Sequence, residues 1–461
     1  MTFAADRPAS TAALPAPASL RVVARDDARI LLAGEAGVAA EYLGSGLANL
    51  PADPSLAVVT TVRLTSGGAA LLEVSGANAT GAPLAAWLRG DAGGFALAFL
   101  AGDDVVTGGA FADRLEGSFG RDVLLGGDGN DSLFGGAGDD ALAGGRGDDL
   151  LVGEAGRDLA TTVALRRQAV VSGDGTGASG PPIRTLAGPE GTDALVAVEA
   201  IRFADGLLDF DAAGPAAQVA RLYGALLGRA PDPIGLSALS GALATGAATL
   251  TGLASGIAAS GEFAARTGAP GPEGLVALLY RNVLGREPDA AGLAFWSGAL
   301  RDGGGGPGAV GTVAVGFSEG AEYVARTGPA VGRLGLWVPS EAAVDVVRFY
   351  EAVLDRRPDA AGLAFWIGER EGGLSADAMA ARFVAAPEFG TRYGGLDDAG
   401  FVAQLYRNAL DREADPAGLG FWAGQLTSGA TDRGGVAVAF ATSAEMTAKI
   451  TPIVADGVVF A

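Results

Sequence analysis

Between residues 99 and 161 the apolar and polar positions of the chain repeat with a period of nine. The eighth position of each nonapeptide holds one apolar residue, in the order Val106, Leu115, Leu124, Leu133, Leu142, Leu151 and Ala160. The sixth position of each is an aspartate, in the order Asp104, Asp113, Asp122, Asp131, Asp140, Asp149 and Asp158. A flexible linker rich in Gly and Asp has no reason to keep an apolar residue in step with every aspartate. The pattern therefore indicates a repeat architecture.

The three central units match the pattern Gly-Gly-x-Gly-x-Asp-x-apolar-x at every position. They are GGDGNDSLF, GGAGDDALA and GGRGDDLLV, and they extend from Gly126 to Val152. The outer units depart from the pattern at Phe99, Phe111, Ser118 and Glu154, each of which replaces a glycine. The motif therefore supports binding sites at the two ends of the array less well than in its centre.

The regions on either side of the nonapeptides predict further strands. Residues 1–98 contain β-branched stretches at 20–25 and 56–64 that are separated by Gly, Pro and Asn turns, which is typical of short strands. Residues 162–213 include a segment at 191–210 in which apolar and polar residues alternate about an Ala204-Asp-Gly turn. We therefore expect a β-rich region before the nonapeptides and a β-strand flank after them.

From residue 214 to residue 461 the pattern changes to that of helices. Four copies of a longer repeat are marked by tyrosines 57, 70 and 56 residues apart, which are Tyr223, Tyr280, Tyr350 and Tyr406. Val219, Leu222 and Leu226 of the first copy fall on one face of a helix. The sequence therefore predicts four tandem helical repeats.

Each of the last three helical copies has an aspartate just before an Ala- or Gly-rich run, and these are Asp289, Asp359 and Asp415. A carboxylate there can accept hydrogen bonds from the free N–H groups of a first helical turn, so each is a predicted N-cap. A tryptophan follows each cap, and we expect all three in the hydrophobic core. They are Trp296, Trp366 and Trp422, and Leu239 takes their place in the first copy, which should pack more loosely.

The composition excludes most catalytic chemistries. The 461 residues include no His and no Cys, which removes Ser-His-Asp triads, Cys-His dyads, His-ligated zinc, haem ligands and iron–sulfur clusters. Lys and Arg total 32 against 53 acidic residues, a net charge of −21, so nucleic acid is not expected as a partner. No run of about 18 uninterrupted apolar residues predicts a transmembrane segment, and the N-terminal residues lack the pattern of a cleaved secretory signal.

The nonapeptides resemble RTX (haemolysin-type) calcium-binding β-roll repeats. The resemblance implies a parallel β-roll with two nonapeptides per turn, in which units two apart lie on the same side and bind Ca²⁺ between them. One side would carry Asp104, Asp122, Asp140 and Asp158, and the other Asp113, Asp131 and Asp149. The implied metal site also includes residues of the glycine-rich turns, namely Gly126, Asp128, Gly135, Ala137, Gly144 and Arg146. Residues 162–213 resemble the strand segment that commonly covers the open end of such a roll.

Stacked aspartates should make folding of the roll depend on the ion. Neighbouring turns lie about 4.8 Å apart, so two stacked carboxylates repel by roughly 3 kcal/mol at an effective dielectric constant of about 20. One small apolar residue per unit does not offset this repulsion. We therefore expect the roll to unfold without calcium and to fold when calcium binds.

The helical copies resemble a bacterial domain of unknown function found in tandem in secreted RTX-type and surface-layer proteins, with some likeness to phycobilisome linker domains. The last residues, 453–461, resemble the uncleaved tail recognised by type I secretion systems, although the same tail could pack on the fourth helical copy. The expected fold class is multidomain α+β, with a β-rich region at 1–98, a β-roll at 99–161, a β flank at 162–213 and helical repeats at 214–461.

These features imply a calcium-binding structural or interaction protein, secreted or held at a cell surface, and not an enzyme. Its expected partners are calcium, the type I secretion apparatus and a cell-surface glycan or protein. Two alternatives stay open. One is a carboxylate-dependent extracellular enzyme such as a glycosidase, and the other is a calcium-dependent carbohydrate-binding adhesin.

Overall fold

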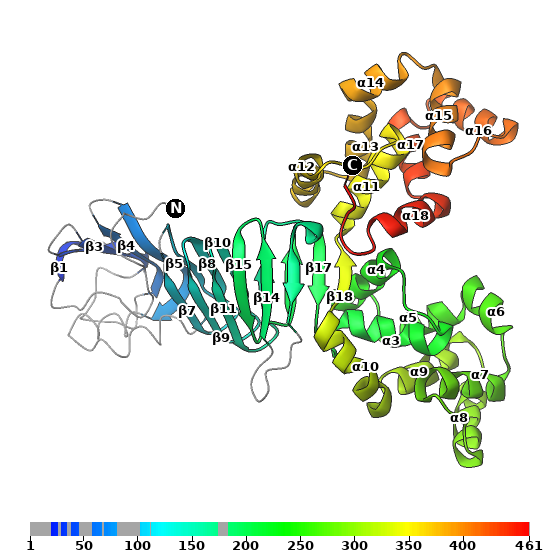
Figure 1. Cartoon of the computed structure of the whole chain (residues 1–461), viewed down its shortest axis with the longest axis horizontal. Coiled ribbons are helices and arrows are strands. Elements are labelled where there is room, and N and C mark those ends of the chain that lie inside the picture. The colour runs from blue at the N-terminus through cyan, green and yellow to red at the C-terminus, as the bar shows by residue number, and fades with distance from the viewer. Residues whose placement is uncertain are drawn as a thin grey trace. The chain divides into compact units, whose positions relative to one another are not determined.

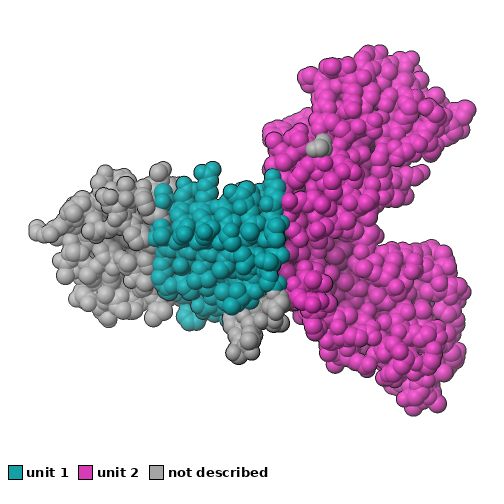
Figure 2. Space-filling model, viewed as in Figure 1, with its two compact units in different colours: residues 1–164, 168–203 teal, residues 165–167, 204–461 magenta. Residues whose placement is uncertain are grey.

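A computed structural model of the chain is shown in Figure 1. The structure describes the backbone of residues 20–25, 29–34, 38–45, 58–66 and 69–80, and all atoms of residues 102–110, 112–173 and 183–460. The predictions that involve Phe99 and Phe111 lie outside the described residues. Two compact units are distinguished in Figure 2, one of residues 1–164 and 168–203 and the other of residues 165–167 and 204–461.

The first unit begins with five strands that pair antiparallel in chain order. They are β1 (Leu20–Arg25), β2 (Arg29–Gly34), β3 (Val38–Ser45), β4 (Val58–Ser66) and β5 (Ala69–Thr80). The strands predicted at 20–25 and 56–64 are confirmed as β1 and β4. β5 then pairs antiparallel with the first strand of the nonapeptide region.

The nonapeptides form two parallel sheets that receive alternate units. One sheet contains β6 (Val105–Thr107), β8 (Val123–Asp128), β10 (Ala141–Arg146) and β12 (Leu159–Thr161). The other contains β7 (Arg114–Phe119), β9 (Ser132–Ala137) and β11 (Leu150–Ala155). Leu124 pairs with Leu142, and Leu133 with Leu151, so paired residues are two units apart. The predicted two nonapeptides per turn are confirmed.

The interior of the roll is made by the eighth position of each unit. The residues there are at most 1% exposed, and they are Val106, Leu115, Leu124, Leu133, Leu142, Leu151 and Ala160. Because each unit contributes one aliphatic side chain, the apolar core of the roll is a single narrow row.

The flank adds strands to the roll. β13 (Val170–Ser172), β14 (Ile183–Gly188) and β15 (Gly191–Val196) form an antiparallel series. β15 also pairs in parallel with β11, and β16 (Ala200–Phe203) pairs in parallel with β12. The predicted strands are present, but β15 and β16 extend both sheets of the roll where we had expected only a cover over its end.

The second unit contains four helical copies. The first consists of α3 (Pro215–Leu227), α4 (Pro233–Ala244), α5 (Leu250–Ala258) and α6 (Gly261–Thr267). The second consists of α7 (Pro272–Leu279), which continues as η7 (Tyr280–Leu284), followed by α8 (Ala290–Asp302), α9 (Pro307–Ser318) and α10 (Ala321–Leu334). The third consists of α11 (Glu341–Leu354), α12 (Ala360–Glu371), α13 (Ala376–Val384) and α14 (Pro387–Tyr393). The fourth consists of α15 (Asp398–Leu410), α16 (Pro416–Thr427), α17 (Arg433–Ala441) and α18 (Ala444–Ile450).

A recurring set of side chains joins the first two helices of a copy, and the third copy shows it fully. Asp359 caps α12 by accepting a 2.8 Å hydrogen bond from the Gly362 N–H. The Tyr350 hydroxyl occupies the space where a side chain on Gly362 would lie. The Arg356 guanidinium stacks 4.7 Å from the Tyr350 ring centre and binds Glu388 through two hydrogen bonds of 2.6 and 2.8 Å. The predicted caps at Asp289 and Asp415 are confirmed in the same way.

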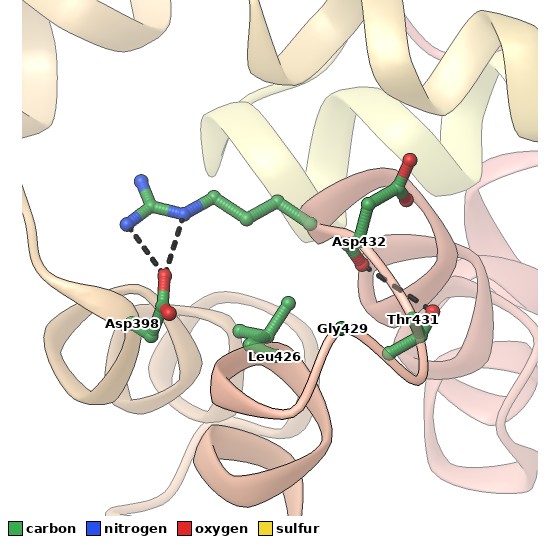
Figure 3. Close-up of a pocket in the computed structure, with 6 residues that line it drawn as sticks. Asp398, Leu426, Gly429, Thr431 and Asp432 are labelled. Atoms are coloured by element: carbon green, nitrogen blue, oxygen red, sulfur yellow. Dashed lines mark hydrogen bonds and ion pairs between the residues drawn. The ribbon is translucent and has the colours of Figure 1, made fainter.

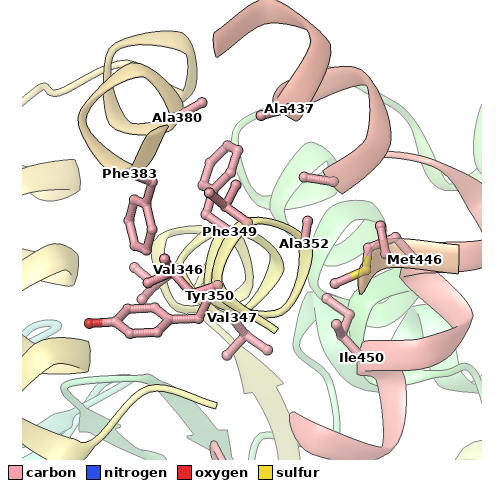
Figure 4. Packing of buried hydrophobic residues seen from close by; sticks show 14 of the residues in the cluster. Val346, Val347, Phe349, Tyr350, Ala352, Ala380, Phe383, Ala437, Met446 and Ile450 are labelled. Carbon is pink, nitrogen blue, oxygen red and sulfur yellow. The ribbon is translucent and has the colours of Figure 1, made fainter. Parts of the chain in front are cut away.

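The helical copies contain two large hydrophobic cores, one for each consecutive pair, and a small third cluster of Ala216, Val219 and Leu236 on α3 and α4. The core of the third and fourth copies surrounds α11, whose Phe349, Ala352 and Tyr350 meet side chains of α13, α17 and α18 (Figure 4). The predicted buried stripe of α3 is confirmed, because Val219, Leu222 and Leu226 are all 0% exposed.

The three tryptophans are less buried than predicted. Each is partly buried and packs on a core phenylalanine, with ring centres 4.9 Å apart for Trp296 and Phe317 and 4.7 Å apart for Trp366 and Phe383. Trp422 and Phe440 form the same pair in the fourth copy. The helix that carries each tryptophan lies at the edge of its core, so the indole covers the core without being enclosed by it.

The chain ends inside the second unit. After η8 (Thr451–Ile453), Val454 and Val458 are 0% exposed and belong to the core of the third and fourth copies. The Trp337 indole N–H donates to the Val454 carbonyl at 3.0 Å, and the Val458 N–H donates to Asp205 Oδ2 at 3.0 Å. Trp337 lies on β18 (Leu336–Pro339), which pairs antiparallel with β17 (Gly206–Asp209). In the folded unit the tail is therefore packed, as one of the two sequence interpretations predicts.

Candidate calcium-binding ladders

The sixth-position aspartates form two hydrogen-bonded ladders. In ladder A, which consists of Asp104, Asp122, Asp140 and Asp158, the N–H of each aspartate donates to Oδ1 of the next at 2.8 to 2.9 Å. In ladder B, which consists of Asp113, Asp131 and Asp149, the same bonds are 2.8 Å long. The sequence placed each aspartate on the correct ladder, because the resemblance implied that units two apart are neighbours.

In Asp122, Asp131, Asp140, Asp149 and Asp158 one carboxylate oxygen accepts the ladder hydrogen bond and the other does not, and in Asp104 neither oxygen has a hydrogen-bond partner. All seven side chains are at most 3% exposed. Oδ2 is buried without a hydrogen-bond partner in Asp104, Asp122, Asp131, Asp140, Asp149 and Asp158. A buried carboxylate oxygen without a partner is costly, so these atoms mark positions where a cation would be bound favourably.

A glycine leaves room beside Oδ2 of Asp122, Asp131, Asp140, Asp149 and Asp158. A Cβ added to Gly126 would fall closer than 3.0 Å to both Asp131 Oδ2 and the Gly144 carbonyl oxygen. Gly117 stands in the same relation to Asp122 Oδ2 and the Gly135 carbonyl oxygen. A carboxylate oxygen and a carbonyl oxygen from the next turn thus converge on a space that only glycine leaves free. We call this arrangement the glycine cradle.

Burial and crowding change the protonation of the ladders. Burial, with like charges in neighbouring rungs adding to it, raises the pKa to about 7 in Asp104, Asp122, Asp131, Asp158 and Asp193. Burial also raises the pKa of Asp140 and Asp149. The N–H groups that donate to these carboxylates act in the opposite direction, but burial is the larger effect. A stack of carboxylates in this environment is stabilised by a proton or by a metal cation.

The turn residues proposed as ligands divide into two groups. Gly126, Gly135 and Gly144 are buried and belong to the cradles. The side chains of Asp128, Ala137 and Arg146 are exposed. The Ala137 and Arg146 carbonyls accept backbone hydrogen bonds from Gly120 and Gly129 at 2.9 and 2.8 Å. The structure therefore brings the glycines close to the aspartates and directs the third-position side chains outward.

Two further rungs were missed by the sequence analysis. The Asp149 N–H donates to Asp193 Oδ1 at 3.2 Å, and the Asp158 N–H donates to Glu199 Oε2 at 2.9 Å. Asp193 continues ladder B and Glu199 continues ladder A. A signal for Asp193 was present, because Gly191, Asp193 and Leu195 have the spacing of the fourth, sixth and eighth positions of a nonapeptide. The 26 extra residues of the flank interrupt the nine-residue period and hide this match.

These ladders fit Ca²⁺. Calcium prefers hard oxygen ligands from carboxylates and carbonyls in a flexible shell, and each cradle offers one of each. Within residues 102–110, 112–173 and 183–460, no group of three or more acidic side chains lies close enough together to hold a metal ion. The positive charge of a bound ion would neutralise the neighbouring rungs.

The second unit also contains a pocket of about 550 Å³, beside α15, α16 and α17 (Figure 3). It is lined by Asp398, Leu426, Gly429, Thr431, Asp432 and Arg433. Asp398 accepts hydrogen bonds from Arg433 at 2.9 and 3.1 Å, and Asp432 caps α17 by accepting one from the Gly435 N–H at 2.8 Å. Both carboxylates thus have structural partners, whereas a glycosidase needs one acid and one base or nucleophile that can reach the substrate.

Three phenylalanines stand on the surface at the same position of successive copies. Phe295, Phe365 and Phe421 are 67%, 59% and 57% exposed, and each precedes the tryptophan of its helix. Each ring meets that tryptophan edge-on, with ring centres 5.0 to 5.2 Å apart. On these helices the phenylalanines are therefore the aromatic residues that face solvent, while the adjacent tryptophans are partly buried.

The comparisons with known proteins agree with this geometry. The family described as RTX calcium-binding nonapeptide repeat (4 copies) matches residues 100–133 and 125–160. The family described as Domain of unknown function (DUF4214) matches residues 215–267, 254–327 and 380–450. None of the curated proteins matches the chain.

Among solved structures, the crystal structure of the extracellular lipase LipA from Serratia marcescens is similar over 39% of this chain and 29% of the lipase chain. The sequence identity is 17% and the TM-score is 0.13. In the described part of the chain, no helix has the length and apolar character needed to cross a membrane. The ladders, the β-solenoid and the two family matches together identify the chain as an RTX calcium-binding repeat protein that carries DUF4214 helical repeats.

Proposed function

We propose that this chain is a secreted or surface-associated interaction protein whose roll folds on extracellular calcium after type I export. The roll serves as a calcium-dependent support, and the helical copies bind the partner. The observation that carries the proposal is the row of buried Oδ2 atoms without hydrogen-bond partners in two ladders of like charge.

The energetics favour folding outside the cell. Each rung adds a buried carboxylate but only one apolar side chain to the interior, so calcium supplies the missing stabilisation. Extracellular calcium modules bind at about 10⁻⁴ to 10⁻³ M. Because cytosolic calcium lies far below this range, the roll would stay unfolded inside the cell, in the state that suits passage through a secretion channel.

The test is the circular dichroism of the whole chain during a calcium titration. We expect β structure to increase up to about 10 mM calcium and to be lost when a chelator is added. Asp131→Asn should shift the transition to higher calcium. Asp128→Asn, in the same unit but exposed, should leave it unchanged. A spectrum that does not respond to calcium would contradict the proposal.

For export, the type I secretion apparatus must bind the tail before the second unit folds, because Val458 is buried in the folded state. Deleting residues 456–461 should keep the protein inside the cell, while calcium still folds the roll of the purified variant. Secretion that continues unchanged would place the signal elsewhere in the chain. Loss of folding of the helical copies would favour a purely structural tail.

The exposed phenylalanines favour the helical copies as the binding part of the protein. Three residues beyond each ring lies a glycine, Gly298, Gly368 or Gly424, where an added Cβ would meet nothing within 4 Å. The helix surface beside each ring is therefore bare, and three such surfaces on one chain suit a repetitive ligand such as a cell-surface glycan. Changing Phe295, Phe365 and Phe421 to Ser should abolish retention on immobilised cell-surface glycans, whereas the equally exposed Leu334→Ser should not.

A further inference from the structure

The stack of paired strands in the roll extends beyond the nonapeptides into the flank. β15 pairs with β11 in the same parallel manner as one nonapeptide with the next, but the partners are 44 residues apart instead of 18. Leu151 faces Leu195, as Leu133 faces Leu151. Leu195 is 1% exposed and continues the buried row of the roll.

The hydrogen bonds that join neighbouring turns of the roll recur between the flank and the roll. The Thr192 N–H donates to Asp148 Oδ1 at 2.9 Å, as the Arg157 N–H donates to Asp139 Oδ1 at 2.9 Å. The Ala194 N–H donates to the Asp149 carbonyl at 2.8 Å, which matches the 2.9 Å bond from Leu150 to Asp131. The 191–197 segment therefore occupies the place of an eighth repeat unit.

A cradle is formed where this segment meets the last nonapeptide. A Cβ added to Gly153 would fall closer than 3.0 Å to Asp158 Oδ2 and to the Ala197 carbonyl oxygen. The first pair of atoms repeats the relation of Gly126 to Asp131, and Ala197 takes the place that Gly144 has in that cradle. Asp158 is 0% exposed, and its Oδ2 has no hydrogen-bond partner.

The backbone of the flank adopts an unusual conformation at Ala197, the residue whose carbonyl belongs to this cradle. Ala197 has a φ of 50°, a left-handed conformation that is unfavourable for alanine. Glu199 follows after one residue and accepts the hydrogen bond from the Asp158 N–H. Beyond it, the buried guanidinium of Arg184 donates to the Val198 carbonyl at 3.1 Å and interacts electrostatically with Glu199. A fixed positive charge thus stands next to the last rung of ladder A.

We propose that Asp158 Oδ2 and the Ala197 carbonyl form an additional calcium site, assembled between the last nonapeptide and the non-repeat flank. Arg184 ends the array because its charge balances Glu199, the rung that follows. This inference rests on the proposed calcium dependence of the roll. It assigns one bound ion to residues outside the nonapeptide array, and it makes the flank part of the metal-binding structure.

The experiment measures the number of calcium ions bound per chain by equilibrium dialysis of the full-length protein. Ala197→Pro should lose one ion, because proline cannot adopt a positive φ and the carbonyl must turn away. Ala197→Gly should keep the full number, because glycine tolerates this conformation without cost. Asp158→Asn should also lose one ion. Circular dichroism at saturating calcium checks that each variant contains a folded roll.

The outcomes separate the two proposals. If the wild-type protein binds no calcium, the proposed function itself fails. If the wild-type protein binds calcium and Ala197→Pro keeps every ion, the flank is not part of a site, even if Asp158→Asn loses one. If Ala197→Pro does not fold, Asp158→Asn with an unchanged ion count overturns the inference, and loss of one ion together with an intact Ala197→Gly supports it.

Discussion

The roll and the helical copies differ in whether their buried charged groups have partners of opposite charge. In the helical copies, buried charges have partners of opposite sign. Arg221, which is 3% exposed, binds Glu319, and Asp345 lies 2.8 Å from Arg370. In the ladders, the charges that act on the buried aspartates are those of further acidic side chains. The buried charges Arg221 and Asp345 of the helical copies are thus paired within the fold, whereas the ladders contain buried carboxylate oxygens without hydrogen-bond partners.

The two regions also differ in what fills their interiors. The largest fully buried side chains of the described residues are Phe349, Phe383 and Phe401, all in the helical copies. The roll buries one aliphatic residue per nonapeptide, and its last nonapeptide buries only Ala160. Hydrophobic stabilisation follows buried apolar area, so we expect the helical copies to be stable without the ion and the roll to depend on it. The proposed calcium dependence would thus divide one chain into an ion-dependent and an ion-independent region.

Removal of calcium should have the largest effect and should separate the two regions. With a chelator, amides of residues 112–161 should lose their protection from hydrogen exchange, because the unneutralised ladders repel. Amides of α11 and α15 should stay protected. Hydrogen exchange followed by mass spectrometry measures both in one sample. Equal loss of protection in the two regions would contradict the comparison.

The metal-free roll should become more stable as the pH falls. Burial raises the pKa of Asp122, Asp131 and Asp158 to about 7 in the fold, against 3.8 for an ordinary aspartate. Between about pH 4 and pH 7 the folded roll therefore holds protons that the unfolded chain has released, and its stability falls as the pH rises through this window. Circular dichroism of the calcium-free protein should show more β structure at about pH 4.5 than at about pH 8. A metal-free roll that gains structure with rising pH would exclude this account of the ladders.

Calcium should bind more tightly across the same window as the pH rises, because metal and protons compete for the same carboxylates. The helical copies give the control. Buried Asp345 lies 2.8 Å from Arg370, and buried Glu351, whose pKa is raised by burial, has Lys449 beside it, so helix content should change much less over this window than β structure.

Glycine substitutions should have opposite effects in the two regions. Gly126→Ala places a Cβ 2.5 Å from the Gly144 carbonyl oxygen and should cost about 3 kcal/mol or more, with loss of the calcium response. Gly368→Ala lies on α12, where an added Cβ meets nothing, and should stabilise the helical copies by up to about 1 kcal/mol. Thermal unfolding with and without calcium measures both. A Gly126→Ala variant that keeps the wild-type calcium response would show that the cradle is not needed.

The fold of the roll could be predicted because one nine-residue period determines its strands, its buried aliphatic row and its aspartate ladders. Leu124 and Leu133 alternate between the two sheets as the resemblance implied, and the aspartates fall on the ladders assigned to them. The flank could not be predicted as a continuation of the stack. Asp193 lies 44 residues beyond Asp149, so its place depends on a hairpin that returns the chain to the sheet edge.

In the helical copies, local signals were sufficient for the caps but not for the tertiary contacts. Asp359 binds an N–H three residues away, and such a contact is visible in the sequence. Arg356 binds Glu388, 32 residues away, and no local pattern indicates this partner. The burial of Trp366 also depended on where its helix meets the core, and a helical period does not contain that information.

The smallest expected effects lie within one helix and test whether the helical copies are independent of calcium. Trp366 packs 4.7 Å from Phe383 and is partly buried, so Trp366→Ala should lower the free energy of unfolding by about 2 kcal/mol, less than for a fully buried aromatic residue. Its neighbour Phe365 is 59% exposed, and Phe365→Ala should change stability by about 0.5 kcal/mol or less. Chemical denaturation followed at the helical circular dichroism band measures both. The change in the free energy of unfolding should be the same with calcium and with chelator, because neither residue belongs to the roll or to its ladders. A Trp366→Ala effect that appears only in calcium would mean that the helical copies depend on the ion after all.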